Sequence, residues 1–415
     1  MATVKPFRAV RPEAKQASEV AALPYDVMNS DEAREMVVGH PVSFLHIDKA
    51  EIDLPKDVDV HSPQVYEQAR NTLQKMIADG VFIQDNTPCF YLYRLTMNGR
   101  SQTGLVATTS IDEYLDGTIK KHEFTRADKE QDRINHVDYC DANTGPIFLA
   151  YRGEDQIQTL TENWKAANDP IYDFTAEDGI SHTVWQIADP DTIQKFAAAF
   201  GKVPALYIAD GHHRTASAVK VGLKRREENP NYDGTEEFNY FLSVIFPDQE
   251  LSIWDYNRVV KDLNGLTTEG FLDTIQDAFH PELVKDADEA RPANAHQFGM
   301  YLDGKWYRLS FDAEKLPEDS ITRLDVSILQ KELLEPILAI GDPRTDKRID
   351  FVGGIRGLQE LERRVDNGEM KLAFAMYPTS VAELMQIADE NKVMPPKSTW
   401  FEPKLRSGLF VHLLK

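Results

Sequence analysis

A short run in the middle of the chain carries the residue types with the most chemical potential. Residues 208–214 read IADGHHR, so an acid, a glycine, two imidazoles and a guanidinium follow one another. The apolar run 203–209 predicts a strand, and the good helix formers from His212 onward predict a helix. Backbone N–H groups at a helix start lack partners within the helix, and the helix dipole favours an anion there. This segment therefore predicts a phosphate-binding turn.

Each residue of the turn has an expected role. Gly211 permits a positive φ or a close backbone approach, while His212, His213 and Arg214 add donors at the helix start. Asp210 is expected to orient a histidine or to hold a divalent cation between two phosphates. An ordinary helix cap explains the acid and the glycine, but it does not explain three consecutive cationic residue types where a helix disfavours cations.

Three other segments carry polar groups that suit the same chemistry. Residues 122–133 contain HEFT and KEQDR, which supply an imidazole, a carboxylate, a hydroxyl and a guanidinium, although a solvated charged face also explains such a run. Residues 395–404, PPKSTWFEPK, offer phosphate donors beside Trp400 and Phe401, or an edge segment with both aromatics in the core. Asp26 precedes a helix, as a metal ligand or as an ordinary turn residue.

These motifs carry two resemblances. The DGHHR box resembles the box of the ParB and sulfiredoxin superfamily, in which a Gly-x-x-Arg turn binds nucleotide phosphates, and its DGHHR form is that of free serine kinases. From end to end the chain also resembles the family called domain of unknown function 1015, whose landmarks stand here as residues 24–27, 122–125, 129–133, 210–214, 256–259 and 394–404. The first resemblance implies a ParB/sulfiredoxin-like mixed-sheet core. Sulfiredoxin-type redox chemistry is not expected, because His212 or His213 stands where that role needs a cysteine.

The leading hypothesis is a nucleotide-dependent phosphotransferase of kinase type. It would act on a small hydroxylated metabolite, such as free serine, with ATP or ADP and Mg²⁺. The expected catalytic residues are Glu123, as the base that takes the acceptor proton, with Asp210 and His213. Asp210 and Asp26 are the expected metal ligands. The expected nucleotide-binding residues are Gly211, His212, His213, Arg214, Thr215, Arg133, Lys397, Ser398, Thr399 and Lys404.

Two other functions stay open. The same turn suits a nucleotide-binding regulator or nucleotidase of ParB-like type, without DNA binding. It also suits a metabolite-binding protein without chemistry. The net charge of −22, from 46 Lys and Arg against 68 Asp and Glu, repels polyanions. The expected partners are therefore a small-molecule substrate and a nucleotide rather than nucleic acid, and a homodimer stays open.

Cysteine content and hydropathy bear on location. Cys89 and Cys140 are the only cysteines, and neither lies in a CxxC pair. This composition favours a reducing compartment, and we expect the cytoplasm. No segment approaches the roughly 20 consecutive apolar residues of a membrane span, so no membrane association is expected.

Alternating hydrophobic patterns predict a mixed α/β (α+β) fold. A β-hairpin is expected at Asn98-Gly99, and Asn29 or Ser30 is expected to cap a helix running through Met36. Other expected strands are 41–48, 89–95, 102–109, 146–151, 182–187, 203–209, 239–246, 349–352 and 371–377, and other expected helices are 63–80, 155–167, 190–200, 269–279 and 325–339. Three regions are predicted: 1–110 with the hairpin, 111–262 as the core that carries DGHHR, and 263–415 ending in PPKSTWFEPK.

Overall fold

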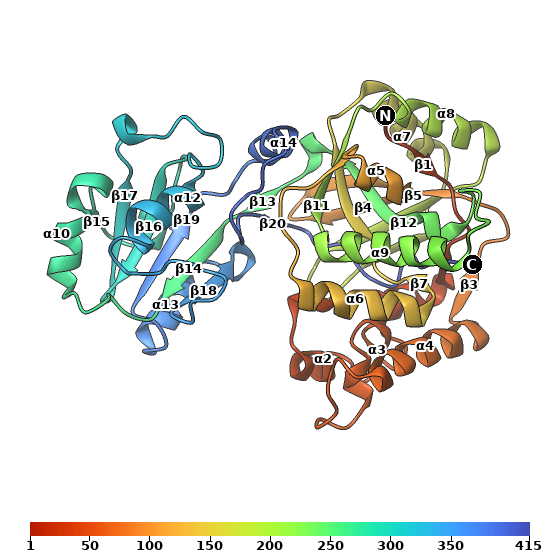
Figure 1. Ribbon diagram of the computed structural model, residues 1–415, viewed down its shortest axis with the longest axis horizontal. Coiled ribbons are helices and arrows are strands. Elements are labelled where there is room, and N and C mark those ends of the chain that lie inside the picture. The colour runs from red at the N-terminus through yellow and green to blue at the C-terminus, as the bar shows by residue number, and fades with distance from the viewer. The chain divides into compact units, whose positions relative to one another are not determined.

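The computed structural model describes residues 1–415, which form two compact units (Figure 1). The first unit comprises residues 1–251 and 403–415, and the second comprises 252–402. This division differs from the three predicted regions. The reason is that the second half of strand β5 (Arg100–Ser110), from the first predicted region, pairs with β12 (Tyr240–Pro247) from the second.

A nine-stranded mixed sheet forms the centre of the first unit. Strands β6 and β11 run parallel, as do β8 and β12, and the other neighbours are antiparallel. The mixed α/β class predicted from the sequence is therefore confirmed. The order is β6 (Ile119–Lys120), β11 (Leu206–Asp210), β8 (Ile147–Tyr151), β12, β5, β4 (Phe90–Met97), β10 (Ser181–Ile187) and β9 (Tyr172–Thr175), with β1 (Val4–Lys5) also paired to β5.

The predicted hairpin turn and the predicted helix cap in the first unit are confirmed. Asn98 and Gly99 have φ of 52° and 78° and join β4 to β5 in a tight hairpin. Asn29 forms a capping box with Glu32 at the start of α2 (Ser30–Met36). Both features depend only on neighbouring residues, which is why the sequence predicts them.

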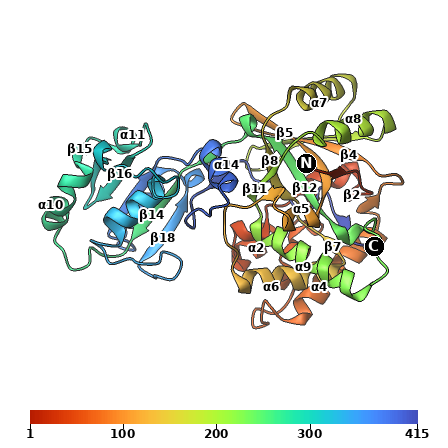
Figure 2. The same cartoon turned by 45° about the horizontal axis from the view of Figure 1, so that its top comes forward.

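Helices pack on both sides of this sheet (Figures 1 and 2). On one face, Ile157 of α7 (Asp155–Ala167) and Phe196 of α8 (Pro190–Phe200) belong to the same buried cluster as Leu105 of β5. Elsewhere, α6 (Ala127–Cys140) and α9 (His212–Glu228) lie side by side, and α4 (Pro63–Ala78) packs on α6. The shorter helices are α1 (Ala17–Val20), α3 (Leu45–Asp48) and α5 (Ile111–Leu115).

The predicted strand 41–48 is wrong. Residues 45–48 form the short helix α3, and Phe44, Leu45 and Ile47 are all buried. A run of apolar residues this short shows neither the period of a strand nor that of a helix, so length and composition misled the prediction.

An antiparallel sheet of six strands forms the second unit. Helix α13 (Leu358–Asp366) packs on it through Leu361, beside Val259 and Ala373. The predicted helix 325–339 is shorter: α12 (Asp325–Leu329) continues as one π-helical turn, Gln330–Leu334. The strand order is β15 (Glu282–Val284), β17 (Lys305–Ser310), β16 (Gln297–Leu302), β19 (Leu372–Met376), β14 (Tyr256–Val260) and β18 (Ile349–Gly353), and the other helices are α10 (Thr268–Phe279), α11 (Ala287–Ala290) and α14 (Val381–Asp389).

Three small strand pairs complete the fold. They are β2 (Val10–Pro12) with β3 (Phe82–Gln84), β7 (Ala142–Asn143) with β21 (His412–Leu413), and β13 (Ile253–Trp254) with β20 (Trp400–Phe401). The last pair holds together the two ends of the second unit. None of the helices combines the length and the apolar character that crossing a bilayer requires.

Candidate functional site

Two parallel strands bring the main motifs together. Strand β6 pairs in parallel with β11, so that Leu206 lies opposite Ile119 and Tyr207 opposite Lys120. The carboxyl ends of parallel strands meet at the same edge of a sheet. The segment after β6 therefore lies beside the DGHHR turn that follows β11, although about ninety residues separate them in the sequence.

The turn into α9 has the shape predicted for it. The pairing of β11 with β8 shifts register between Ile208 and Asp210, which is a bulge-type irregularity. Gly211 then takes a φ of 94°. The Arg214 side chain folds back over this glycine, and a Cβ at Gly211 would lie 3.2 Å from the Arg214 Nε. Glycine is required here for its φ and to admit the guanidinium.

Asp210 lies between two cations. Its Oδ2 is 3.2 Å from the Lys404 Nζ and 3.9 Å from an Arg214 Nη, and its Oδ1 accepts a 2.9 Å hydrogen bond from the Gly211 N–H. Burial alone would raise the pKa of Asp210, but Lys404 and Arg214 hold it well below the usual range. The carboxylate is therefore ionised and already partnered. Lys404, predicted among the nucleotide-binding residues, lies beside Asp210.

Arg214 is fixed in place and charged. It donates a hydrogen bond to the Pro146 carbonyl, and its side chain is 12% exposed. Burial works against the charged form, yet the carboxylates of Asp26 and Asp210 raise the pKa of Arg214. Asp26 itself is exposed on the 3-10 turn Tyr25–Val27. The two predicted metal ligands, Asp210 and Asp26, thus both act on the same guanidinium.

The two histidines of the box have a role that the sequence did not predict. The Nε2 of His213 accepts a 3.0 Å hydrogen bond from the Arg126 N–H, and the Nε2 of His212 accepts a long, 3.5 Å contact from the His122 N–H. Burial lowers the pKa of both imidazoles. They are neutral at neutral pH and attach the segment 122–126 to α9. The expectation of three cationic donors is corrected to one, Arg214, because a buried helix start disfavours charged imidazoles.

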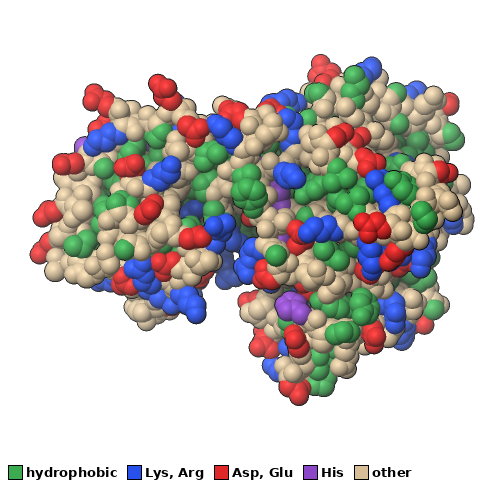
Figure 3. Space-filling view, viewed as in Figure 1, with side chains coloured by type: hydrophobic (Ala, Val, Ile, Leu, Met, Phe, Trp, Pro, Cys, Tyr) green, Lys and Arg blue, Asp and Glu red, His purple; other side chains and the backbone are tan.

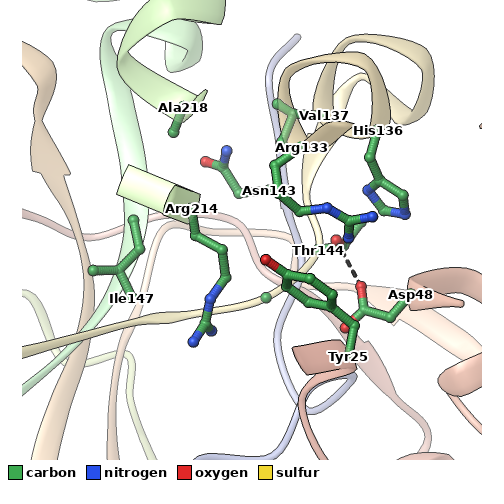
Figure 4. A pocket seen from close by; sticks show the side chains of 11 residues that line it. Tyr25, Asp48, Arg133, His136, Val137, Asn143, Thr144, Ile147, Arg214 and Ala218 are labelled. Atoms are coloured by element: carbon green, nitrogen blue, oxygen red, sulfur yellow. Dashed lines mark hydrogen bonds between the residues drawn. The ribbon is translucent and has the colours of Figure 1, made fainter. Parts of the chain in front are cut away.

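Arg133 lies at a cavity beside the turn. Its guanidinium stacks 4.0 Å from the centre of the Tyr25 ring and bonds to Asp132. Figure 4 shows Arg133 from α6 and Arg214 from α9 both near Tyr25. On the wall beside them, the Thr144 hydroxyl donates a 3.0 Å hydrogen bond to Asp48. The cavity therefore holds two guanidiniums close to the predicted phosphate turn.

Glu123 lies beside His122 and His212. Its Oε2 is 3.9 Å from the His212 Nδ1, and its side chain is 38% exposed while that of His212 is 6% exposed. One ligand atom from each of these three residues lies within 4.8 Å of the others, as a metal ion would require. Neither Asp210 nor Asp26 is part of this group.

The other predicted nucleotide-binding residues belong to two different units. Thr215 is fully buried, and its hydroxyl donates to the Gly211 carbonyl within the helix, 2.9 Å away. Lys397, Ser398 and Thr399 belong to the second unit. There the Lys397 carbonyl accepts a 2.9 Å hydrogen bond from Arg258, and the Ser398 hydroxyl donates to the Pro395 carbonyl at 2.6 Å.

Sequence reasoning missed several residues of the cavity. Tyr25 lies within the family landmark 24–27, which suggested no role for it, and Asp48 lies within the predicted strand 41–48. Asn143 and Thr144 received no role, although a polar pair directly before the buried strand β8 is a usable signal for a site at a sheet edge. For Asp48 the sequence offers no such signal.

The ion pairs near the turn matter more for its charge than the net charge of the whole chain. On the face of the first unit that Figure 3 shows, basic and acidic side chains are mixed with apolar ones. The charges that matter at the turn are the individual pairs of Asp210 with Lys404 and Arg214, which are partly shielded from solvent.

With this geometry established, the chain can be placed in a family. The model of the family described as "Protein of unknown function (DUF1015)" matches residues 4–327. The protein belongs to this family, as its sequence motifs predicted. No curated protein matches the chain.

Solved structures give weak likenesses. A free serine kinase in complex with AMP is 15% identical, with 74% of this chain and 91% of that chain covered and a TM-score of 0.37. A conserved hypothetical protein from Pyrococcus furiosus is 16% identical, with coverages of 75% and 95% and a TM-score of 0.35. SbnI from Staphylococcus aureus, truncated at its C-terminus, is 11% identical, with coverages of 74% and 87% and a TM-score of 0.38. Nothing about the activity of this chain follows from such scores.

Proposed function

We propose that this protein is a nucleotide-dependent phosphotransferase that acts on a small hydroxylated metabolite, such as a free amino acid like serine. The observation that carries the proposal is the convergence at the start of α9. A buried arginine, a lysine and two carboxylates, Asp210 and Glu123, meet there at the edge of the sheet. A phosphotransferase needs a phosphate-binding turn, charge neutralisation and a base close together.

Each part of the chemistry has a candidate residue. The first N–H groups of α9 and the guanidinium of Arg214 bind the phosphates of ATP or ADP, and Lys404 stabilises the charge that develops on transfer. Asp210 and Asp26 are the residues that would hold Mg²⁺, which would supply positive charge to the phosphates. Glu123 is the candidate base, because its carboxylate is partly exposed and lies beside the start of α9.

The direct test is an assay of the pure full-length chain. It is incubated with Mg²⁺, with ATP or ADP, and with a panel of hydroxylated metabolites, and phosphorylated products are detected by mass spectrometry. A product that forms only when nucleotide, Mg²⁺ and one acceptor are all present is the expected result. Failure of every acceptor with both nucleotides contradicts the proposal. Stabilisation by a nucleotide in a thermal-shift assay without any turnover would instead favour the regulator hypothesis.

Variants of one helix sharpen this test. Arg214→Ala is expected to lower kcat/KM by about a hundredfold or more, since it removes the charged phosphate contact. Arg226→Ala is the matched control: Arg226 lies near the other end of α9 and pairs with Asp112 at 2.7 Å. The control should retain the activity of the wild type. Equal losses in both variants would show that the helix, rather than the guanidinium, had been disturbed.

A further inference from the structure

His122, Glu123 and His212 form a cluster that the proposed transfer reaction uses only in part. Each residue presents one ligand atom, and the three atoms lie within 4.8 Å of one another. The two imidazole rings meet edge to face, with centroids 4.4 Å apart and an angle of 88° between the planes. In the proposed transfer reaction only the Glu123 carboxylate has a role. The transfer reaction does not explain why two imidazoles lie beside it.

His122 supplies a second, independent observation. Its side chain is 2% exposed, and neither ring nitrogen makes a hydrogen bond of good geometry. The other deeply buried histidines are different. His136 bonds the Ile47 carbonyl, His182 bonds Tyr93, and His412 bonds Asn143. Leaving a buried polar group poorly paired is costly, so a buried ring whose nitrogens lack hydrogen bonds of good geometry and lie among other ligand atoms points to ligand binding.

The protonation states suit a metal ion. Burial lowers the pKa of His122 to about 4, and burial together with the neighbouring His122 lowers the pKa of His212. Both rings are therefore neutral, which is the form that binds metals. The adjacent carboxylate completes a set of two imidazoles and one carboxylate, a combination known for zinc.

The distances require only a small adjustment. Two ligand atoms on a tetrahedral ion, each about 2.1 Å from it, lie roughly 3.4 Å apart. The His212 Nδ1 and the Glu123 Oε2 are 3.9 Å apart. Binding at Nδ1 moves the proton of the His212 ring to Nε2. The 3.5 Å contact of this nitrogen with the His122 N–H then opens, and this contact is already at the limit of a hydrogen bond.

We propose that His122, Glu123 and His212 bind a divalent ion of the borderline class, such as Zn²⁺, and that this ion inhibits phosphoryl transfer by engaging the Glu123 carboxylate. Imidazole ligands favour such ions over Mg²⁺, which prefers oxygen ligands and retains its waters. The inhibitory part rests on the proposed function, because it needs Glu123 to act as the base. The binding part does not.

Metal binding is tested first, on the full chain without nucleotide. Co²⁺ is titrated into chelator-treated protein, and the visible absorption of tetrahedral cobalt is recorded. Equilibrium dialysis against Zn²⁺ then gives the stoichiometry. The expected result is one ion per chain, with the affinity lowered at least about tenfold in His122→Leu and in Glu123→Gln. His182→Leu is the matched control, a buried histidine outside the cluster, and it should bind like the wild type.

The outcomes separate the two parts of the proposal. Absence of a cobalt spectrum and of bound zinc in the wild type overturns the site, and so does unchanged affinity in Glu123→Gln. This variant changes a partly exposed side chain, and melting curves check that each variant is folded. Inhibition is tested by adding Zn²⁺ to the transfer assay at saturating Mg²⁺. Zinc that binds without slowing transfer overturns the inhibitory part alone. A chain that never transfers phosphate overturns the proposed function and the inhibitory part, while the cobalt titration still decides the site.

Discussion

Two groups of polar side chains in the first unit, each built around a buried histidine, differ in how completely that histidine is hydrogen-bonded. We call the first the β4–β10 network, which comprises Arg11, Asp85, Tyr91, Tyr93, His182 and Arg406. We call the second the helix-start cluster, which comprises His122, Glu123 and His212. In the network, the Arg11 Nε and Nη2 donate to Asp85 at 2.9 and 2.8 Å, and Tyr93 bonds His182 at 2.7 Å.

The cluster lacks this completeness. Neither ring nitrogen of His122 makes a hydrogen bond of good geometry, and the contact between His212 and Glu123 is 3.9 Å long. The central histidines of the two groups, His182 and His122, are 0% and 2% exposed, so burial alone does not distinguish a well hydrogen-bonded histidine from one that is not. The difference suggests what to test: a well-paired network should contribute to stability, whereas a buried imidazole such as that of His122, without hydrogen bonds of good geometry, suits the ligand binding that we propose.

The largest effect is expected in the network. Asp85→Ala leaves the guanidinium of Arg11 buried without its partner, and both side chains are about 10% exposed. Breaking a buried ion pair from one side costs about 3–5 kcal/mol of the free energy of unfolding. Chemical denaturation of the variant and of the wild type at pH 7 measures this loss. A loss below about 1 kcal/mol would mean that the network does not hold the fold, and the comparison would fail.

A smaller loss, with a pH signature, is expected for His182→Leu. The variant leaves the Arg406 Nε without an acceptor and the Tyr93 hydroxyl oxygen without the ring N–H that donates to it, and it should cost roughly 2 kcal/mol at pH 7. Burial and Arg406 lower the pKa of His182 to about 3. In the unfolded chain the pKa of a histidine is about 6.5, so the folded state binds fewer protons between these values.

The stability that this neutral histidine contributes is therefore present above pH 6.5 and is lost as the pH falls towards 3. The leucine variant has no such group. Denaturation curves at pH 7 and at pH 5 should show the gap between wild type and His182→Leu narrowing on acidification. A gap that stays constant or widens would contradict the assignment of a neutral imidazole.

The smallest effect has the opposite sign. His122→Leu replaces two unpaired ring nitrogens with apolar surface of similar size, so in metal-free buffer it should raise the free energy of unfolding by about 1 kcal/mol. A histidine-to-leucine substitution is thus expected to destabilise the protein at position 182 and to stabilise it at position 122. If His122→Leu is destabilising in the presence of a chelator, the ring has a partner that its surroundings do not show, and the contrast disappears.

Local signals in the sequence predicted much of the fold. The hairpin turn at Asn98-Gly99, the Asn29 cap and the start of α9 each depend on a few adjacent residues. The strand expected at 41–48 failed because its apolar run is too short to show a period. The boundary between units was also missed, since it depends on the pairing of β5 with β12.

In the candidate site, too, the sequence predicted local features but not those that depend on burial or on distant residues. Residue types alone predicted the phosphate turn, its glycine and the phosphate donor Lys404, whereas Glu123 depended on the resemblance. The state of His212 was not, because the pKa of an imidazole depends on burial that no spacing reveals. The contact of Lys404 with Asp210 joins residues 194 positions apart, and the parallel pairing of β6 with β11 is equally non-local.

That long separation also has a consequence for the order in which the chain is made. Asp210 belongs to the first part of the first unit, but Lys404 is synthesised only after the whole of residues 252–402. A nascent chain can therefore form the central sheet and the turn at Gly211 before this lysine exists. Until residue 404 has been added, Asp210 lacks the cation that does most to hold its pKa down. The order of synthesis thus delays completion of the site until the second unit has been made.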